Sequence, residues 1–448
     1  LNPLMTQGQI EALENHANED IKKIFLPKLN SGEWSGTMNL TEPQAGSDVG
    51  SLRSIAEIDK DNTYKITGQK IYISWGDHSL SSNICHLLLA RLPKSPKGIK
   101  GISLFLVPKY IPDNKGNLIE KNSINTISLE HKMGLHGSPT AILEYQNAKA
   151  WLIGEENNGM KAMFTMMNNA RLGVAVQGLS QSELATQKSI EFAKNRHQGR
   201  NLNNPEDTFT SIINHADVRR NLLIMKSMTF ISRALCFDTA ITIDLSKTKN
   251  DSFLKRKASF LTPISKSFCT EMGSKIADLA IQIHGGMGYI EETGISQIYR
   301  DVRVTSIYEG TNGIQAMDFV GRKLGSNGDV AYSILEEVKK NEEAIVSKHP
   351  EVAKKIKHAR ISLKKALDWM ISKNDLNDRY SGADPFLRAF ALIIGANYMI
   401  KTLLITDQDE KIELAYFFLK NLLPFCSIES SISMLGADNL YENANSIF

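Results

Sequence analysis

The chain has 448 residues, of which 42% are hydrophobic and 23% charged, and it carries a formal net charge of +3 at pH 7. This length exceeds the usual size of one hydrophobic core, so two or three domains are expected. So small a charge does not indicate a nucleic-acid-binding protein, and no uninterrupted apolar stretch approaches the roughly 20 residues that span a bilayer.

The cysteines are few and widely spaced: Cys85, Cys236, Cys269 and Cys426. Without a CxxC pair, this spacing argues against a zinc site and against a disulfide framework, and it favours a reducing compartment. The amino terminus also lacks the basic-then-apolar pattern of a signal peptide. We therefore expect a cytoplasmic protein that neither binds nucleic acid nor inserts into a membrane.

The chain opens with a helical pattern that has a charged face, from Ile10 to Leu29. It begins at Leu1 without an initiator Met, and the helical pattern follows almost at once. We expect an upstream piece to be missing.

The region from Trp34 to Ile153 has β character. Short β-prone runs occur at Tyr64–Thr67, Lys70–Ser74, Cys85–Ala90 and Ile102–Val107. Turn-forming Gly, Pro, Asn and Asp residues separate them, which predicts an antiparallel β domain.

After Gly159 the apolar residues recur every three and four positions, which indicates long packed helices. The pattern covers Met160–Phe192, Ile212–Ile243 and Pro263–Ile283, with a loop at Asn201–Thr210 that contains Pro205. A polar hinge at Gly325–Gly328 precedes a further helical stretch, Val330–Phe448. We expect a helix bundle followed by a small appended helical domain.

Three motifs have residues suited to chemistry. The turn Thr41–Asp48 has small residues and hydroxyls that suit a phosphate or a polar ring edge, although a plain surface turn has the same composition. Gly285–Gly288 predicts a helix end or a close backbone contact, and it lacks the G-x-G-x-x-G spacing of a dinucleotide-binding site. Glu309 lies between Tyr308 and Gly310 and suits a general base if its surroundings are apolar; otherwise it is an ordinary surface glutamate.

The motifs Leu40–Asp48, Gln282–Gly288 and Ile307–Thr311 together resemble those of the acyl-CoA dehydrogenase family, in the family's order. The resemblance implies a multidomain α and β fold with an antiparallel β-barrel middle domain, a carboxy-terminal helix bundle and a helical extension. The corresponding divisions are 1–33 for the last part of an amino-terminal helical domain that is largely missing, 34–155 for the barrel, 156–325 for the flavin-binding bundle and 326–448 for the extension.

The resemblance implies FAD as the cofactor. Thr41 would contact the flavin ring, Ser47 would contact the phosphates, and Tyr72 and Ser74 would flank the isoalloxazine. Arg196 would contact the pyrophosphate of a FAD that is held mainly by a neighbouring subunit. Gln282 and Gly286 would lie near the adenosine end, and Thr311 would also contact the cofactor. Such sharing implies a homodimer or larger homo-oligomer. Many relatives have Gln where this chain has Gly313, which removes one expected contact.

The resemblance also implies the chemistry: Glu309 would take the α proton of an acyl-CoA while a hydride passes from the β carbon to FAD. Arg171 and Tyr308 would bind the substrate, although the usual partner of this arginine, an aspartate, is Asn168 here and an ordinary ion-pairing or helix-capping role stays open. Short fatty acyl-CoAs and 3-methylmercaptopropionyl-CoA are the expected substrates. Met163, Met166 and Met167 would line a pocket for sulfur or, more simply, fill the core.

The reduced flavin is expected to pass its electrons to an electron-transfer flavoprotein. Two alternatives stay open: an acyl-CoA oxidase, in which oxygen reaches the reduced flavin, and a non-dehydrogenating relative that binds DNA. The second predicts a basic surface, and the net charge of +3 does not favour it.

Overall fold

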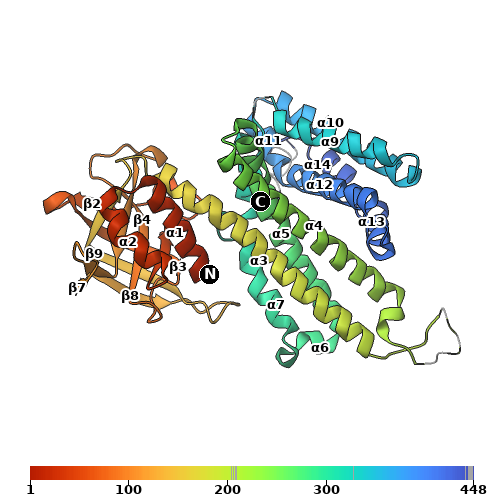
Figure 1. The fold of residues 1–448 in the computed structure, drawn as a ribbon, viewed down its shortest axis with the longest axis horizontal. Coiled ribbons are helices and arrows are strands. Elements are labelled where there is room, and N and C mark those ends of the chain that lie inside the picture. Colours follow the sequence, from red (N-terminus) through yellow and green to blue (C-terminus); the bar gives the residue numbers. More distant parts are fainter. Residues whose placement is uncertain are drawn as a thin grey trace. The chain divides into compact units, whose positions relative to one another are not determined.

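The computed structural model describes residues 1–202, 204, 206, 209–325, 327–438, 440, 441 and 447. They form two compact units, Leu1–Gly173 and Val174–Phe448. The first unit is rich in strands and the second is helical (Figure 1), which confirms the expected fold class. The predicted loop at residues 201–210 is described only in part, and its Pro205 lies outside the described residues.

Two helices open the first unit, α1 (Asn2–His16) and α2 (Glu19–Asn30), where the sequence predicted one helical segment. The break falls before Asn18, whose side-chain oxygen accepts a hydrogen bond from the amide of Ile21 at 2.9 Å and caps α2. Phe25 on α2 packs edge-on against Trp34, with ring centroids 5.4 Å apart, and joins the helix to the hydrophobic core of the first unit.

The strands of the first unit are β1 (Trp34–Asn39), β2 (Ile55–Ile58), β3 (Tyr64–Ser74), β4 (Asn83–Arg91), β5 (Ile102–Pro108), β6 (Tyr110–Pro112), β7 (Leu118–Lys121), β8 (Ile124–Leu129) and β9 (Thr140–Ile153). Strand β4 pairs with β2, β2 with β3, β3 with β9, β9 with β5, and β5 again with β4. This circuit of pairings is closed, as a small barrel requires. The two runs predicted between Tyr64 and Ser74 form one strand.

Two pairings differ from the antiparallel arrangement that the sequence predicted, because β1 and β2 both pair in parallel with β4, β2 only through Ile55 opposite Arg91. Strand β1 runs parallel to β4, from Trp34 opposite Asn83 to Asn39 opposite Leu88. The hairpin of β2 and β3 lies between them in the sequence. A connection of this length permits parallel pairing, which a tight turn cannot.

The helix α3 (Gly159–Asn195) begins in the first unit and ends in the second. The predicted helices of the bundle are confirmed. The second unit also contains α4 (Ala216–Thr248), α5 (Ser252–His284), α6 (Gly286–Tyr289), α7 (Ile295–Val302), α8 (Asn312–Asp318), α9 (Asp329–Ile345), α10 (Pro350–Ser372), α11 (Leu376–Ser381), α12 (Ala383–Ile405), α13 (Asp409–Asn421) and α14 (Phe425–Ile432).

The segment after the hinge shares one hydrophobic core with the bundle. Phe386 and Phe390 on α12 pack against Phe260 on α5 and against Phe319, with ring centroids 5.4–5.8 Å apart. All four rings are fully buried. Within the second unit, the segment after residue 326 packs as part of the bundle. The division of the chain into 1–33, 34–155, 156–325 and 326–448 stays a prediction.

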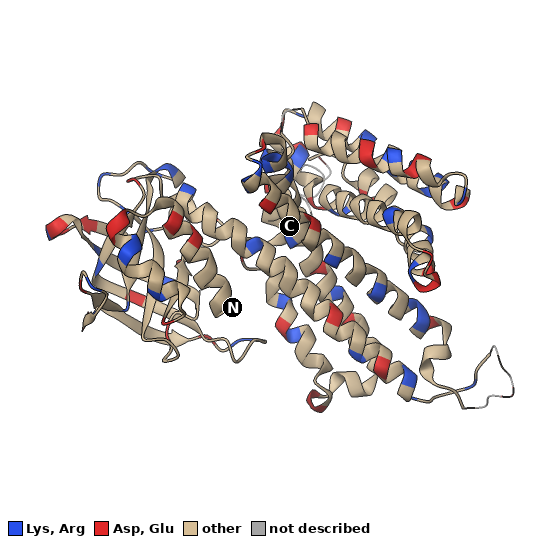
Figure 2. Ribbon diagram, viewed as in Figure 1, with Lys and Arg blue, Asp and Glu red and all other residues tan. Residues whose placement is uncertain are grey.

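Helix α12 is long and apolar enough to cross a membrane by length and composition, although Arg388 and Lys401 interrupt its apolar residues. Of its most apolar window, 67% is buried inside the protein, as in the core helix of a soluble protein. Basic and acidic residues alternate along the helices of the second unit (Figure 2). The four cysteines are free and buried, and the fold brings the Sγ atoms of Cys236 and Cys269 within 3.7 Å despite their separation in the sequence.

Candidate active site

The turn Thr41–Asp48 is anchored by a buried ion pair. Lys70 on β3 is fully buried, and its Nζ lies 2.8 Å from Oε1 of Glu42 and donates to the carbonyl of Leu40 at 3.0 Å. Glu42 also accepts hydrogen bonds from the amide and hydroxyl of Ser54. The ion pair therefore fixes the base of the turn, whereas Ser47 at its tip is exposed.

Because of this pair, stability should depend on pH in the acid range. Burial alone would raise the pKa of Glu42, but the Lys70 ammonium and the donors from Ser54 and Arg53 lower it to about 2. A glutamate in the unfolded chain has a pKa of about 4.3. The stability that Glu42 contributes is therefore complete above that pH and is lost as the pH falls toward 2. Urea unfolding at several pH values should show wild type losing its advantage over Glu42→Gln across this window.

Exposed Glu57 on β2 provides the matched control for this measurement. The difference between wild type and Glu57→Gln should stay nearly constant from pH 5 to pH 2, because the side chain gains no buried partner on folding. An equally constant difference for Glu42→Gln would contradict the role assigned to the ion pair.

Tyr72 projects from an irregular part of β3. The pairing with β9 shifts between Lys70 and Ile73, and the backbone of Tyr72 has a φ of +59°. Bulges of this kind redirect side chains, and the ring of Tyr72 is 62% exposed. The amide of Ile71 donates to the carbonyl of Thr41 at 2.9 Å, so the structure brings Thr41 and Tyr72 to the same edge of the first unit, with half-buried Ser74 close by on β3.

Glu309 lies in a strained turn of the second unit. Its φ is +55°, and that of Gly310 is +82°. A non-glycine residue with positive φ is uncommon and persists only where the surrounding contacts fix it. Oε2 of Glu309 is buried, and the Tyr308 hydroxyl beside it donates to Oε1 of Gln177. Burial first, and then the Glu309 carboxylate, raise the pKa of Tyr308, so the phenol stays protonated.

Thr311 caps the helix that follows this turn. Its Oγ1 accepts a hydrogen bond from the amide of Ile314 at 3.2 Å, which closes the first turn of α8. A hydroxyl that accepts one hydrogen bond still has a proton to donate, so the cap is compatible with the predicted contact between Thr311 and a cofactor.

Sequence reasoning missed two side chains that hold the turn. Nζ of Lys266 on α5 donates to the carbonyl of Gly310 at 2.7 Å, and Nε2 of Gln315 on α8 donates to the carbonyl of Glu309 at 3.1 Å. Both side chains are fully buried. A signal for Lys266 was present, because a lysine in an otherwise uncharged helical stretch from Phe260 to Thr270 has no reason to be there unless its charge has partners.

Three predicted cofactor residues gather at the other end of α5. Gln282 and Gly286 flank the end of that helix, and Phe192 on α3 stacks on His284 with ring centroids 4.2 Å apart. This contact brings the end of α3, and with it exposed Arg196, close to the glycines. A Cβ at Gly285 or Gly286 would meet no atom within 4 Å, so the space there is open.

Arg171 and the methionines before it belong to the first unit. Arg171 is 5% exposed and donates to Oδ1 of Asn168 at 3.4 Å, so the asparagine accepts a hydrogen bond from this arginine. Met163 and Met166 are fully buried in the hydrophobic core, and a Cβ on Gly8 of α1 would lie 2.8 Å from Cγ of Met166. These two methionines therefore fill the core.

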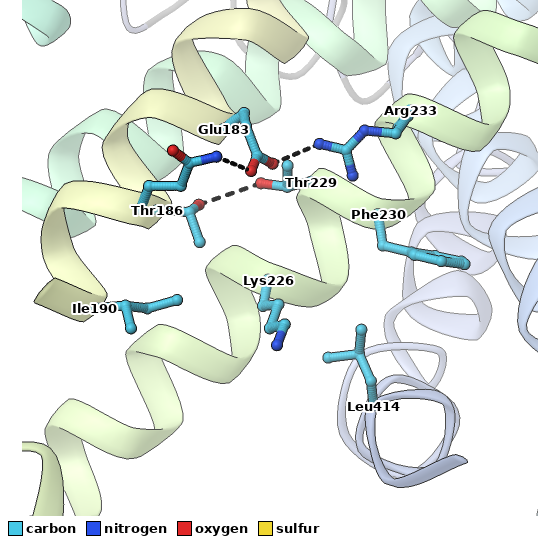
Figure 3. A pocket seen from close by; sticks show the side chains of 9 residues that line it. Glu183, Thr186, Ile190, Lys226, Thr229, Phe230, Arg233 and Leu414 are labelled. Carbon is cyan, nitrogen blue, oxygen red and sulfur yellow. Dashed lines mark hydrogen bonds and ion pairs between the residues drawn. The ribbon is translucent and has the colours of Figure 1, made fainter. Parts of the chain in front are cut away.

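Two cavities are lined by none of the site residues named above. One, of about 160 Å³, lies in the second unit where α3 and α4 face Leu414 on α13 (Figure 3). Its charged residues are partnered: Arg233 pairs with Glu183, which also accepts from Gln187. Although burial would raise the pKa of Glu183, these contacts lower it, so it stays ionised and the cluster joins helices rather than supplying a base.

The other cavity, of about 280 Å³, lies in the first unit and contains Asp77, His86 and Lys109. Burial lowers the pKa of His86 to about 3, and its Nδ1 lies 2.7 Å from the hydroxyl of Thr37. Lys109 and Asp77 form an ion pair at 2.6 Å. Within the described residues, no group of three His, Cys, Asp or Glu side chains is placed to hold a metal ion.

Comparison with known proteins defines the class. Residues 37–148 match the family model for the middle domain of acyl-CoA dehydrogenases, and residues 157–324 match the model for their C-terminal domain. The chain belongs to the acyl-CoA dehydrogenase family. The resemblance seen in the sequence is thereby confirmed, and with it the FAD-dependent oxidoreductase class.

The chain is similar to individual members of the family whose names include a substrate. The chain is 43% identical to a 3-methylmercaptopropionyl-CoA dehydrogenase of Ruegeria pomeroyi over 86% of this chain and 67% of that protein. It is 39% identical to a butyryl-CoA dehydrogenase of Syntrophomonas wolfei over 71% of this chain but only 54% of that protein. The chain thus spans between about half and two thirds of the length of these relatives.

Solved structures agree on the fold. The structure of Caenorhabditis elegans ACDH-11 in complex with C11-CoA matches with a TM-score of 0.85 and 22% identity, covering 100% of this chain and 75% of that one. The butyryl-CoA dehydrogenase of Megasphaera elsdenii matches with a TM-score of 0.59 and 28% identity, covering 70% of this chain and 75% of that one. The first match covers the helical segment after residue 326 as well as the bundle.

Proposed function

We propose that the protein dehydrogenates acyl-CoA thioesters to trans-2-enoyl-CoA with bound FAD, and that Glu309 is the base. The observation that carries the proposal is the Tyr308–Gly310 turn, which holds one carboxylate oxygen buried beside a protonated phenol. A carboxylate removed from water in this way is a stronger base toward a weak carbon acid. Glu309 would take the α proton, and the strained turn would keep its side chain aimed at one position.

The residues present fit FAD. Tyr72 keeps a large aromatic ring exposed on a bulge of β3, beside the turn that begins at Thr41, which suits stacking on a flat ring system. Exposed Arg196 and the open space at Gly286 suit the pyrophosphate and adenosine. When bound, FAD supplies the acceptor for the hydride from the β carbon. The side chains named here would hold and orient it.

The spacing along α5 supports cofactor sharing between subunits. Lys266, which contacts the Glu309 turn, and Gln282 are sixteen residues apart on this helix, roughly 24 Å at a rise of about 1.5 Å per residue. In the arrangement that we propose, one subunit uses the Glu309 end for its own flavin and the Gln282 end for its neighbour's, and the separation of the two ends is compatible with it. We infer a homodimer or larger homo-oligomer, an electron-transfer flavoprotein as electron acceptor and a cytoplasmic location.

The substrate is proposed to be short. Relatives named for butyryl-CoA and 3-methylmercaptopropionyl-CoA stand among the most similar proteins. 3-Methylmercaptopropionyl-CoA has a methylthio group on the β carbon where butanoyl-CoA has a methyl group. An apolar pocket separates ligands that differ by one methylene-sized unit by only about 1–3 kcal/mol, so the two substrates should have kcat/KM values within about 200-fold of each other. Specificity constants for these two, octanoyl-CoA and hexadecanoyl-CoA check this, and a clear preference for hexadecanoyl-CoA would contradict the short-chain assignment.

The visible spectrum of the purified protein tests the function as a whole. Yellow protein with flavin absorbance that bleaches on adding an acyl-CoA without oxygen would support FAD and dehydrogenation together. Peroxide formation in air, compared with reduction of a dye, separates a dehydrogenase from an oxidase. Bound flavin that no acyl-CoA bleaches would overturn the proposal.

A further inference from the structure

Lys266 is a buried cation that the proposed reaction does not itself require. It lies on α5, its side chain is fully buried, and its ammonium donates to Oδ1 of Asn312 at 3.0 Å as well as to the carbonyl of Gly310. Burial of an ammonium is unfavourable unless its hydrogen bonds are satisfied. Both of these acceptors belong to the turn that follows Glu309.

Asn312 extends the contact between this turn and α5. Its Oδ1 also accepts from the hydroxyl of Thr270 at 3.1 Å, and its Nδ2 donates to the carbonyl of Ser267 at 3.2 Å. Asn312 therefore uses both ends of its amide on α5, and Lys266 bonds to the turn at two points. The backbone after Glu309 is thus tied to a long, buried helix.

Gln315 holds the other side of the same turn. Its Nε2 donates to the carbonyl of Glu309, and a Cβ on Gly310 would lie 2.7 Å from that nitrogen. The positive φ favours glycine at position 310, and a Cβ there would displace the Gln315 amide from its present position. Successive carbonyls, those of Glu309 and Gly310, are held by donors from two different helices.

We propose that Lys266 is a positioning residue for the base: together with Gln315 it holds Glu309 and Gly310 in the positive-φ conformation that aims the Glu309 carboxylate. The inference rests on the proposed function for its catalytic meaning, but the conformation of the turn is a separate property of the chain. A base misplaced by about 1 Å slows a reaction by up to 10²-fold, so the positioning has a measurable consequence.

The test compares Lys266→Met with Lys275→Met, which removes an exposed lysine from the same helix. In the FAD-loaded protein, Lys266→Met should lower kcat by roughly 10- to 100-fold while the KM for butanoyl-CoA changes little. Hydrogen–deuterium exchange of peptides covering residues 303–318 should become faster in Lys266→Met alone. Lys275→Met should match wild type in both measurements.

A second variant guards against loss of folding. Asn312→Ala removes the acceptor for Lys266 and Thr270 without removing a buried charge, and it should show the same split between kcat and KM to a smaller degree. If the turn exchanges as in wild type in both variants, or if it loosens while kcat is unchanged, the positioning role is wrong. If wild-type flavin is not bleached by any acyl-CoA, the proposed function fails, while the exchange measurement still decides whether Lys266 orders the turn.

Discussion

Replacing Glu309 with glutamine is expected to leave FAD bound and to slow the bleaching of the flavin by acyl-CoA by about 10²–10⁴-fold, the usual effect of removing a general base. The amide has nearly the shape of the carboxylate, so the turn and its contacts should persist, but the amide cannot take the α proton. Stopped-flow absorbance of the flavin without oxygen, with saturating butanoyl-CoA, measures the rate directly.

The matched control for this prediction is Glu343→Gln, which changes an exposed glutamate on α9. It should bleach at the wild-type rate. The flavin content of both variants, read from the ratio of visible to ultraviolet absorbance, shows whether a slow rate comes from the missing base or from a missing cofactor. Wild-type bleaching by Glu309→Gln would mean that another group takes the proton.

The sequence predicted the parts of the site that depend on local chemistry. The glycines at 285–288 predicted a helix end, and α5 ends at His284 with Gly285 at a φ of +59°. The family resemblance also predicted that the aromatic ring of Tyr72 flanks the isoalloxazine, and the structure shows this ring to be exposed. It could not predict the bulge that exposes this ring, because a register shift depends on how β3 pairs with the distant strand β9.

The contacts that organise the Glu309 turn could not be predicted, because they join segments far apart in the chain. Lys266 reaches Gly310 across 44 positions, and Glu42 meets Lys70 across 28. A single lysine or glutamate is typical of a protein surface, and the uncharged neighbours of Lys266 in the sequence indicate burial without indicating which residue it contacts. Only packing makes their charges buried and paired, and a single sequence contains no direct measure of packing.

The same limit applies to α12, whose burial within the second unit the sequence did not predict. Hydrophobic periodicity predicted helices from Val330 onward, and the structure contains them. The apolar residues of Ala383–Ile405 do not form an uninterrupted run, so the sequence analysis predicted no membrane-spanning segment there. The helix is nevertheless apolar on nearly all sides, which fits its place within a shared core. Whether the apolar faces of a helix are all buried depends on its neighbours, which for α12 come from both the bundle and the segment after residue 326.

Phe390→Ala is expected to lower the free energy of unfolding by about 3–5 kcal/mol, because it removes a fully buried ring whose neighbours cannot close the cavity. The ring contacts Phe260 on α5 at 5.4 Å, Phe319 at 5.8 Å and Phe386 at 5.1 Å between centroids, so it connects α12 to the bundle. The loss should therefore reach both segments: in hydrogen–deuterium exchange, the buried amides of α5 and of α12 should lose protection together.

Urea unfolding followed by circular dichroism gives the magnitude of this loss. The matched control is Phe425→Ala, which truncates a ring that is 52% exposed and should lower the free energy of unfolding far less. Faster exchange confined to α12, with α5 as protected as in wild type, would instead make the later segment an independently folding domain.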